Sequence, residues 1–465
     1  MFGCAVSING DYALIGTNED NNDTGSAYVF KRNGTTWTEE QKLTASDGNN
    51  WDQFGISVAI DGGYAIIGAW EDDDNGKNSG SAYVFKRNGT TWTEEQKLTA
   101  SDGNNWDHFG YSVSIDGDYA VIGAGWDDDN GEDSGSAYIF KRNGTSWIQH
   151  QKLTASDGGI CDLFGKSVSI DKDYIAIVAP YCNDYTNSTV YVFKRNNSIW
   201  VEEAKLIVSD PSADLFSSVS INGKYVLIGD YYGNNDTGSA YVFKRNGTSW
   251  SQQATLIASD GEKYDNFGYS VSIDKNYAIV GAWKDKGSAY IFERNGTTWA
   301  EEQKLTASDG ESGDQFGISV AIDDNYAVIG AGWDDDNGDS SGSAYIFRRN
   351  QPPDIPTIDG PTSGKARRTY FYTAVTIDLE NDKIAYLFNW GDGTTSGWTD
   401  FFPSGTEASA SHSWKEGNYD IRVKAKDDQG LESRWSNPLS ITIPRNKVSF
   451  NSLILRFLER FIIKV

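Results

Sequence analysis

The chain has 465 residues, a formal net charge of −26 and an isoelectric point near 4.4. Its length exceeds that of one ordinary domain core, so we expect two or more domains. The acidic charge argues against nucleic acid or an anionic membrane as a partner of the main body, because both would repel it, although the same charge also keeps a large protein soluble. Three cysteines are too few for a disulfide scaffold, and no apolar run is long enough to span a bilayer.

One unit of sequence recurs along residues 1–350. It opens with a phenylalanine that occurs seven times, at Phe2, Phe54, Phe109, Phe164, Phe216, Phe267 and Phe316. This interval of roughly fifty residues is that of a four-stranded propeller blade. In the second repeat we expect an inner strand over 54–60, a buried strand over 64–69, a third strand over 81–85 and a polar outer strand over 92–98. The predicted fold class is therefore all-β, and the first domain is a seven-bladed β-propeller.

The ends of the first two strands carry a recognisable motif. Phe54-Gly55 is followed by Gly68-Ala69, and Phe109-Gly110 is followed by Gly123-Ala124. These pairs resemble the FG-GAP repeat of integrin-α-type propellers, with departures at Gly16-Thr17, Phe216-Ser217 and Gly229-Asp230. The resemblance implies a secreted or cell-surface domain that binds a partner and serves as a scaffold, and it does not imply an enzyme.

Acidic residues gather in the loop after the second strand. In the integrin-like family several repeats hold Ca²⁺ between strands one and two, but here that connection is a tight turn such as Asp116-Gly117-Asp118, with no room for five or more oxygen ligands. The candidate ligands lie instead at Glu71, Asp73, Asn75, Asp127, Asp128, Asp129, Asp334, Asp335 and Asp336. Oxygen ligands on a loop turned by glycine suit Ca²⁺, while adjacent like charges are also typical of a solvated loop. Calcium is the one cofactor that the sequence predicts.

Four tryptophans follow the Gly-Ala pair at matching positions, namely Trp70, Trp126, Trp283 and Trp333. Because they come after equivalent strands, we expect them to share one face of the propeller. Such a ring would offer stacking platforms to a ligand, and the alternative interpretation is that the rings pack between blades. The pattern favours a calcium-dependent carbohydrate-binding propeller as the second functional hypothesis.

Two kinds of covalent modification are also predicted. Cys161 and Cys182 flank the first hairpin of the fourth repeat at nearly opposite positions, so we expect a disulfide bond if the protein is exported, with Cys4 free. Asn-Gly-Thr sequences begin at Asn33, Asn88, Asn143, Asn246 and Asn295. They match the N-glycosylation pattern, although Asn-Gly is also simply a favoured two-residue hairpin turn.

A second domain follows the repeats. Pro352, Pro353 and Pro356 mark a linker. Within residues 351–445, short strand-like runs over 370–377, 384–390, 419–426 and 439–443 suggest an immunoglobulin-like β-sandwich. Trp390-Gly391-Asp392-Gly393 followed by His412 resembles a PKD domain, a module that serves as a spacer or in adhesion on secreted proteins. Residues 446–465 form a short basic amphipathic tail, which either docks on a membrane surface or an export component or folds back on the sandwich.

No catalytic constellation is visible. His108, His150 and His412 do not stand at a spacing with Cys, Ser or paired carboxylates that supports nucleophilic or metal chemistry. An acid/base pair hidden among the many carboxylates is the remaining enzymatic alternative. We therefore expect a non-catalytic adhesion or scaffold protein, extracellular or on the cell surface, whose propeller loops bind a protein or a glycan.

The seventh repeat lacks one expected strand. A tryptophan opens the outer strand six times, at Trp37, Trp92, Trp147, Trp200, Trp250 and Trp299, whereas the seventh repeat runs from Phe347 into Pro352. Propellers avoid bare edges, so we expect a Trp-led strand and a signal peptide upstream of Met1 in the full gene. Without that strand, we expect Ser343–Phe347 to be an edge prone to pair with other chains.

Overall fold

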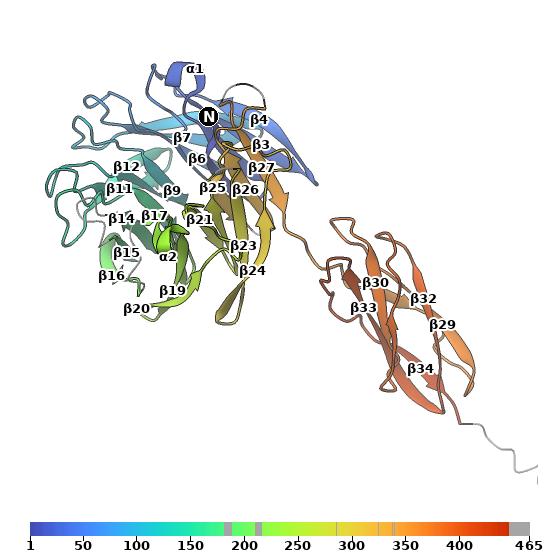
Figure 1. The fold of residues 1–465 in the computed structure, drawn as a ribbon. Coiled ribbons are helices and arrows are strands. Elements are labelled where there is room, and N and C mark those ends of the chain that lie inside the picture. Colours follow the sequence, from blue (N-terminus) through green and yellow to red (C-terminus); the bar gives the residue numbers. More distant parts are fainter. Residues whose placement is uncertain are drawn as a thin grey trace, which may run out of the picture. The chain divides into compact units, whose positions relative to one another are not determined.

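The computed structural model describes residues 1–180, 188–209, 216–284, 286–323, 325–336, 338 and 340–445. These residues fall into two compact units, of which the first is Met1–Arg348 and the second begins at Arg349. Both units are built almost entirely from β-strands, which confirms the predicted all-β class (Figure 1). The boundary lies two residues before the linker that the sequence predicts.

The first unit consists of seven antiparallel sheets, called blades 1 to 7, whose strands follow chain order. Blade 1 contains β1 (Phe2–Asn9), β2 (Tyr12–Thr17), β3 (Ser26–Asn33) and β4 (Thr36–Leu43). Blade 2 contains β5 (Ser57–Asp61), β6 (Tyr64–Ala69), β7 (Ser81–Asn88) and β8 (Thr91–Leu98). Blade 3 contains β9 (Ser112–Asp116), β10 (Tyr119–Ala124), β11 (Ser136–Asn143) and β12 (Ser146–Leu153). Blade 4 contains β13 (Ser167–Asp171), β14 (Tyr174–Ala179), β15 (Thr189–Asn196) and β16 (Ile199–Leu206).

Blades 5 and 6 repeat this plan, and blade 7 has three strands among the residues that the structure describes. Blade 5 contains β17 (Phe216–Asn222), β18 (Tyr225–Asp230), β19 (Ser239–Asn246) and β20 (Ser249–Leu256). Blade 6 contains β21 (Phe267–Asp274), β22 (Tyr277–Ala282), β23 (Ser288–Asn295) and β24 (Thr298–Leu305). Blade 7 contains β25 (Phe316–Asp323), β26 (Tyr326–Ala331) and β27 (Ser343–Arg348). Two four-residue turns, α1 (Asp20–Asp23) and α2 (Gly233–Asp236), follow β2 and β18, and the two central residues of each turn have a left-handed backbone conformation.

The glycines of the repeat motif let adjacent blades touch through their backbones. Gly55 has a φ of +100°, and a Cβ there would lie 2.3 Å from the carbonyl oxygen of Ser26 in blade 1. A Cβ on Gly68 would lie 1.9 Å from the carbonyl oxygen of Gly110 in blade 3. A side chain at either position would force the blades apart, which explains why the motif requires glycine.

The blades close into a ring, because blade 1 packs on blade 7. Ser319 donates a hydrogen bond to the carbonyl oxygen of Gly3 at 2.8 Å, and the amide of Phe2 donates to the carbonyl oxygen of Ser341 at 2.9 Å. In Figure 1 the N-terminus accordingly lies beside the sheet of β25, β26 and β27. Six of the seven motif phenylalanines are buried, whereas Phe2 is partly exposed, and Phe54 makes edge contacts with Tyr83 and Phe85 of its own blade.

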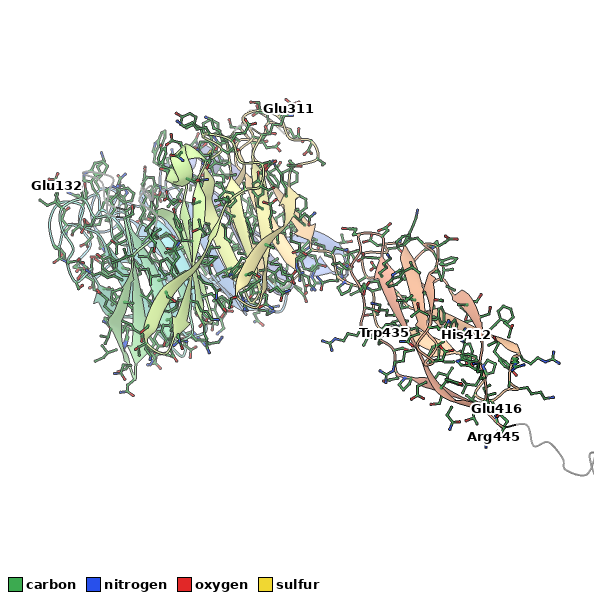
Figure 2. The ribbon with its side chains drawn as sticks, turned by 60° about the horizontal axis from the view of Figure 1, so that its bottom comes forward. Glu132, Glu311, His412, Glu416, Trp435 and Arg445 are labelled. Carbon is green, nitrogen blue, oxygen red and sulfur yellow. The ribbon has the colours of Figure 1, made fainter. Side chains whose placement is uncertain are left out.

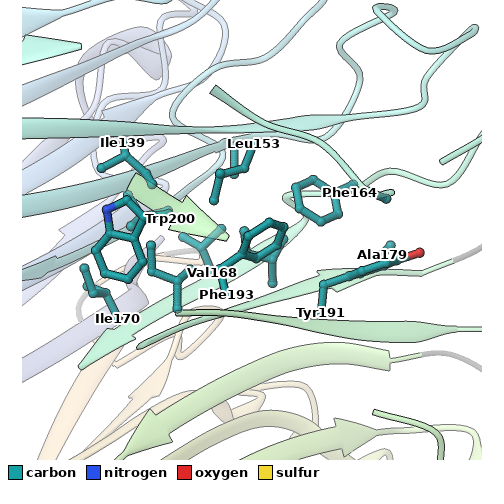
Figure 3. Close-up of a cluster of buried hydrophobic side chains, with 14 of the residues drawn as sticks. Ile139, Leu153, Phe164, Val168, Ile170, Ala179, Tyr191, Phe193 and Trp200 are labelled. Atoms are coloured by element: carbon teal, nitrogen blue, oxygen red, sulfur yellow. The ribbon is translucent and has the colours of Figure 1, made fainter. Parts of the chain in front are cut away.

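The hydrophobic core lies between blades. Figure 3 shows the cluster between blades 3 and 4, where Ile139 and Leu153 meet Phe164, Val168 and Trp200. Burial of each large side chain contributes about 1.5–3 kcal/mol, so the ring is held by apolar contacts repeated at every interface. The outer strands take part in this core, since Trp200 is 2% exposed.

The second unit is a sandwich of two sheets. One sheet has the order β28 (Thr357–Asp359), β29 (Thr369–Val375), β32 (Ala408–Ser413), and the other has the order β31 (Thr395–Trp398), β30 (Ile384–Asn389), β33 (Gly417–Asp427), β34 (Leu439–Ile443). Trp390 and Trp414 lie in the shared core, and the indole of Trp414 donates to the carbonyl oxygen of Trp390 at 3.0 Å. The sequence predicts β29, β30, β33 and β34 but misses β28, β31 and β32, which are short or mostly exposed.

Candidate functional site

Two sets of loops meet at one end of the propeller, which we call the loop end. In blade 2 the amide of Gly55 donates to the carbonyl oxygen of Gly68 at 2.9 Å, so the repeat begins beside the point where β6 ends. The loop that enters blade 3 pairs with the loop that leaves β6, since the amide of Trp106 donates to the carbonyl oxygen of Lys77 at 2.8 Å. Figure 2 labels Glu132 and Glu311, which belong to these two kinds of loop.

Trp51 and Trp106 extend from the loop end in a conformation that bulky residues avoid. Their φ angles are 78° and 72°, and their side chains are 63% and 49% exposed. A left-handed backbone conformation costs an L-residue about 1–2 kcal/mol. Side chains that are this exposed gain too little from burial to offset that cost. Gly313 occupies the same position before blade 7 with a φ of 111°. Packing therefore does not explain why these two loops carry tryptophan, and strain of this kind points to a function.

Further inside the loop end lies an inner aromatic cluster, which consists of Trp70, His108, Tyr111, Trp126 and Lys166. The rings of Trp70 and Trp126 have centroids 5.9 Å apart, and His108 lies between them at 4.6 Å from Trp70 and 4.9 Å from Trp126. Tyr111 contacts both tryptophans edge-on. Blades 2, 3 and 4 all contribute, so the cluster forms only when these three neighbouring blades pack together.

Lys166 is the cation of this cluster. Its Nζ lies 3.9 Å from the ring centroid of Tyr111 and 4.1 Å from that of Trp126. Among the described residues no carboxylate lies within ion-pair distance of this ammonium, although the chain contains 66 acidic residues. Burial lowers the pKa of Lys166 to about 7, because charge is disfavoured where water is excluded. Burial also lowers the pKa of His108, with a smaller contribution from the charge of Lys166.

The other two predicted tryptophans lie apart from this cluster. Trp283 contacts Tyr269 at 5.6 Å, and Tyr269 contacts Tyr231 at 5.5 Å. Trp333 is 47% exposed. Both Trp126 and Trp333 are separated from the Gly-Ala pair by an extra glycine, whereas Trp70 and Trp283 follow it directly. The four residues therefore all lie near the loop end, but they do not form one regular ring.

The acidic loops surround lysine side chains. In blade 2 the Nζ of Lys97 lies 2.9 Å from Asp47, 3.0 Å from Asp72 and 2.6 Å from Asp74. In blade 3 Lys152 repeats this arrangement with Asp102, Asp127 and Asp129. Lys97 and Lys152 belong to the outer strands β8 and β12. The sequence of the acidic loops alone therefore does not reveal that a cation lies beside them.

The predicted calcium ligands mostly bond to their own loop. Asp73 and Asp128 accept backbone amides of Asn78 and Asp133 at 2.7 and 2.8 Å, and Asp335 accepts that of Ser340 at 2.6 Å. Burial raises the pKa of Glu71, and the amide nitrogen of Asn75 donates to Ala100 at 3.0 Å. In the part of the chain that the structure describes, no three acidic, His or Cys side chains are arranged to hold a metal ion. An ammonium already supplies the positive charge in blades 2 and 3, so these loops do not fit Ca²⁺, and calcium at Asp334, Asp335 and Asp336 stays a prediction.

Other predicted features have mixed outcomes. Cys161 is disulfide-bonded and Cys4 is free, but Cys182 lies outside the described residues, so the pairing of Cys161 with Cys182 stays a prediction. The tail over 446–465 also lies outside them. The Asn-Gly sequences form the hairpin turns expected of them, with Gly89 at a φ of 66°, and their glycosylation stays a prediction. Within the described ranges, no helix is long and apolar enough to cross a membrane.

Sequence reasoning missed Trp51, Trp106, Tyr264 and Lys166. Tyr264 lies in the loop before blade 6 with a φ of 73° and is 54% exposed. A signal for the first three was present, because each stands three residues before a motif phenylalanine in a loop rich in Gly, Asn and Asp. Lys166 directly follows the Phe-Gly pair of blade 4, where the other repeats have Cys, Ile, Tyr or Ser. A charged residue at that otherwise uncharged position marks an inner site.

Comparison with known proteins places the repeats in a family. The FG-GAP repeat model matches residues 1–30, 37–85, 92–140, 147–193, 200–243, 250–292 and 299–347. Over 89 residues, 19% of its length, the chain is 34% identical to Collagenase ColA from Bacillus cereus, and it spans 8% of that protein. The PKD domain of an M14-like peptidase from Thermoplasmatales archaeon SCGC AB-540-F20 is 46% identical over 21% of this chain and 99% of that chain, with a TM-score of 0.20. Because the repeat model matches well over half of the residues, the chain belongs to the FG-GAP repeat family.

Proposed function

We propose that the chain is a non-catalytic adhesion or scaffold protein, secreted or on the cell surface, whose loop end binds a protein or glycan partner. The observation that carries the proposal is the pair Trp51 and Trp106, which are strained, aromatic and exposed. Tryptophan is enriched among residues that dominate binding energy, since it buries a large area with few rotatable bonds. The sandwich then acts as a spacer.

Export is part of the proposal. The disulfide bond at Cys161 supports it, because such bonds persist in oxidising compartments. Repeats of the matched family are typical of extracellular proteins, and the collagenase similarity is of the same kind. No step of chemistry is assigned to the chain.

The test is a glycan and protein array probed with the whole chain and with the double variant Trp51→Gly, Trp106→Gly. Glycine suits the left-handed backbone there, so the variant should fold as well as the parent. Ile199→Thr is the matched control, because Ile199 is 59% exposed at the start of β16, an outer strand. We expect at least one ligand whose binding falls roughly tenfold or more in the double variant only. Absence of any ligand, or equal binding by all three proteins, would contradict the proposal, and a parallel array with chelator tests the calcium dependence.

A second candidate function is carbohydrate binding at the inner aromatic cluster. The neighbouring rings of Trp70 and Trp126 favour a sugar ring, and the ammonium of Lys166 favours a sugar that carries a carboxylate. Oligogalacturonate and its methyl ester differ in that charge and in one methyl group per esterified carboxylate. We expect the parent to prefer the acid and Lys166→Met to bind both forms equally, whereas no preference in the parent would exclude this candidate.

A further inference from the structure

Blades 2 and 3 each hold one buried carboxylate of their acidic loop in the same way. In blade 2 the carboxylate of Asp72 lies 3.0 Å from the hydroxyl groups of both Ser81 and Tyr83. The Nζ of Lys97 lies at the same distance from it. In blade 3 the equivalent serine, tyrosine and lysine lie 3.0, 2.8 and 2.9 Å from the carboxylate of Asp127. We call these three donors of a blade the carboxylate seat.

Blade 6 has a carboxylate seat of the same composition, made of Ser288, Tyr290 and Lys304. Ser288 stands opposite Ala282, and Tyr290 stands opposite Lys304. The three donors of blade 2 stand in the same register, so the backbone directs both sets alike. Asp260 fixes two of the donors, since it lies 2.8 Å from the hydroxyl of Tyr290 and 2.6 Å from the Nζ of Lys304, as its counterpart does in blade 2.

The loop that fills the seat of blade 2 is shorter in blade 6. It spans residues 70–80 in blade 2 but only residues 283–287 in blade 6. Among the described residues, the donors of blade 6 meet one carboxylate, that of Asp260, and the hydroxyl of Ser288 makes no hydrogen bond. Asp285, the acidic residue of the short loop, lies outside the described residues.

A cavity of about 260 Å³ lies beside this seat. It is lined by the three donors and by Ala282 and Gly287. Lys284 and Lys286 of the short loop also line it, so this loop brings two further cations, whereas the loop of blade 2 carries the acidic run 71–74. Pockets for drug-sized ligands have roughly 300–1,000 Å³. The cavity of blade 6 therefore suits a small molecule.

The lining of the cavity indicates the chemistry of its ligand. The seat supplies an ammonium and two hydroxyl groups, the donor set to which a carboxylate bonds in blades 2 and 3. The loop that enters blade 6 contributes Asp260, Glu262 and Asp265, which when ionised accept hydrogen bonds and do not donate them. A ligand that satisfies both sets carries one carboxylate and, away from it, hydroxyl or amino groups.

We propose that the cavity of blade 6 binds a small acid that carries hydroxyl or amino groups. Its carboxylate accepts hydrogen bonds from Ser288, Tyr290 and Lys304, in the place that Asp72 occupies in blade 2. Its other groups donate to the carboxylates of the entering loop. Hydrogen bonds to an ionised group are stronger than those between neutral groups, and donors that are already fixed lose little freedom on binding.

The probes are gluconate, a hydroxy acid, and sorbitol, which has a hydroxymethyl group in place of the carboxylate. They are titrated into the whole chain by calorimetry at millimolar concentrations, with β-alanine as the probe for an amino acid. We expect gluconate or β-alanine to bind at least roughly tenfold more tightly than sorbitol, because only the acids offer a charged acceptor to the seat. The tighter of the two acids identifies the class of ligand.

Two variants locate the binding in the seat. Lys304→Met removes the ammonium and should weaken binding of the acid roughly tenfold or more, and Ser288→Ala should weaken it roughly threefold. Lys172→Met is the matched control, because Lys172 lies in a turn of blade 4 and its side chain is 77% exposed. This control should bind the acid as the parent does.

Several results would overturn the proposal. Neither acid binds, or sorbitol binds as tightly as gluconate, or Ser288→Ala and Lys304→Met both bind the acid as the parent does. Binding that appears only in an Asp285→Asn variant would mean that the short loop supplies its own carboxylate to the seat. None of these results depends on the two tryptophans that carry the proposed function, so this site and that function fail separately.

Discussion

The Nζ of Lys97 lies 3.0 Å from Oδ2 of Asp72, a carboxylate whose side chain is 4% exposed. The same relationship joins Lys152 to Asp127 at 2.9 Å. The hydroxyl groups of Ser81 and Tyr83 also donate to Asp72, both at 3.0 Å. A lysine from the outer strand therefore ties the acidic loop to the edge of the blade, and the loop depends on it.

Lys97→Met should destabilise the propeller by roughly 3 kcal/mol, because it leaves the buried charge of Asp72 without a cation. Lys172→Met is the control, since the ion pair of Lys172 with Asp171 is at the surface, with the lysine 77% exposed, and such pairs contribute little. Urea denaturation of the three proteins at pH 7 measures the difference. Equal midpoints for Lys97→Met and the parent would mean that the lysine is not needed.

The repeat period, the motif glycines and the strand order were predictable from sequence because each rests on local pattern. Gly55 and Gly68 stand where adjacent blades touch through their backbones and leave no space for a side chain. The recurrence of these glycines in the sequence therefore indicates where neighbouring blades meet. The alternation of large apolar and small residues along the inner strand likewise indicates which side chains are buried. The structure differs in one respect, because β5 begins at Ser57 rather than at Phe54.

The candidate site was less predictable because it depends on contacts between blades. Lys97 stands 25 residues after Asp72, and only the register of β7 with β8 brings the two together. The inner aromatic cluster needs three neighbouring blades packed together. The conformation of Trp51 is likewise invisible in sequence, since tryptophan is an improbable residue for a positive φ.

Asp52 should make the free energy of unfolding depend on pH. A single substitution at this residue separates its contribution from that of the other titratable groups. Its side chain is buried, the amide of Asn49 donates to it at 2.6 Å, and burial raises its pKa to about 6. Asp72 and Asp73 add to this increase, while the amide of Asn49 and Lys97 oppose it. Between pH 4 and pH 6 the folded state holds a proton that the unfolded state, with an ordinary pKa of about 3.9, has released. The stability that this group contributes is therefore present in acid and is lost as the pH rises through about 6.

Asp52→Asn keeps the acceptor oxygen and cannot ionise. We expect the variant to match the parent near pH 4 and to exceed it by roughly 1–3 kcal/mol at pH 8. Denaturant titrations across that range give the difference curve. A difference of constant size across the range would show that the carboxyl of Asp52 does not titrate in the way that its burial requires.

Trp106→Gly should leave the free energy of unfolding unchanged or raise it by up to about 1 kcal/mol. The substitution removes a strained φ at a half-exposed side chain and loses the contacts of the ring with Lys77, at 4.6 Å, and with His108, at 6.1 Å. Trp147→Gly is the contrast, because Trp147 is 2% exposed in β12 and its loss should cost about 3–5 kcal/mol. Thermal melting of both variants decides the matter, and a large loss at Trp106 would mean that its role is structural.

Trp414 should control the stability of the second unit alone. Its side chain is 2% exposed, its indole donates to the carbonyl oxygen of Trp390, and the ring of His412 contacts it edge-on at 4.8 Å. Trp414→Phe leaves that buried carbonyl unpaired and opens a cavity, so the unit should lose roughly 2–4 kcal/mol. Trp435→Phe is the control, because Trp435 is 37% exposed. In differential scanning calorimetry we expect Trp414→Phe to lower one transition and leave the propeller transition in place. If both transitions shift together, the two units are coupled in folding and the separation at Arg348 does not describe their energetics.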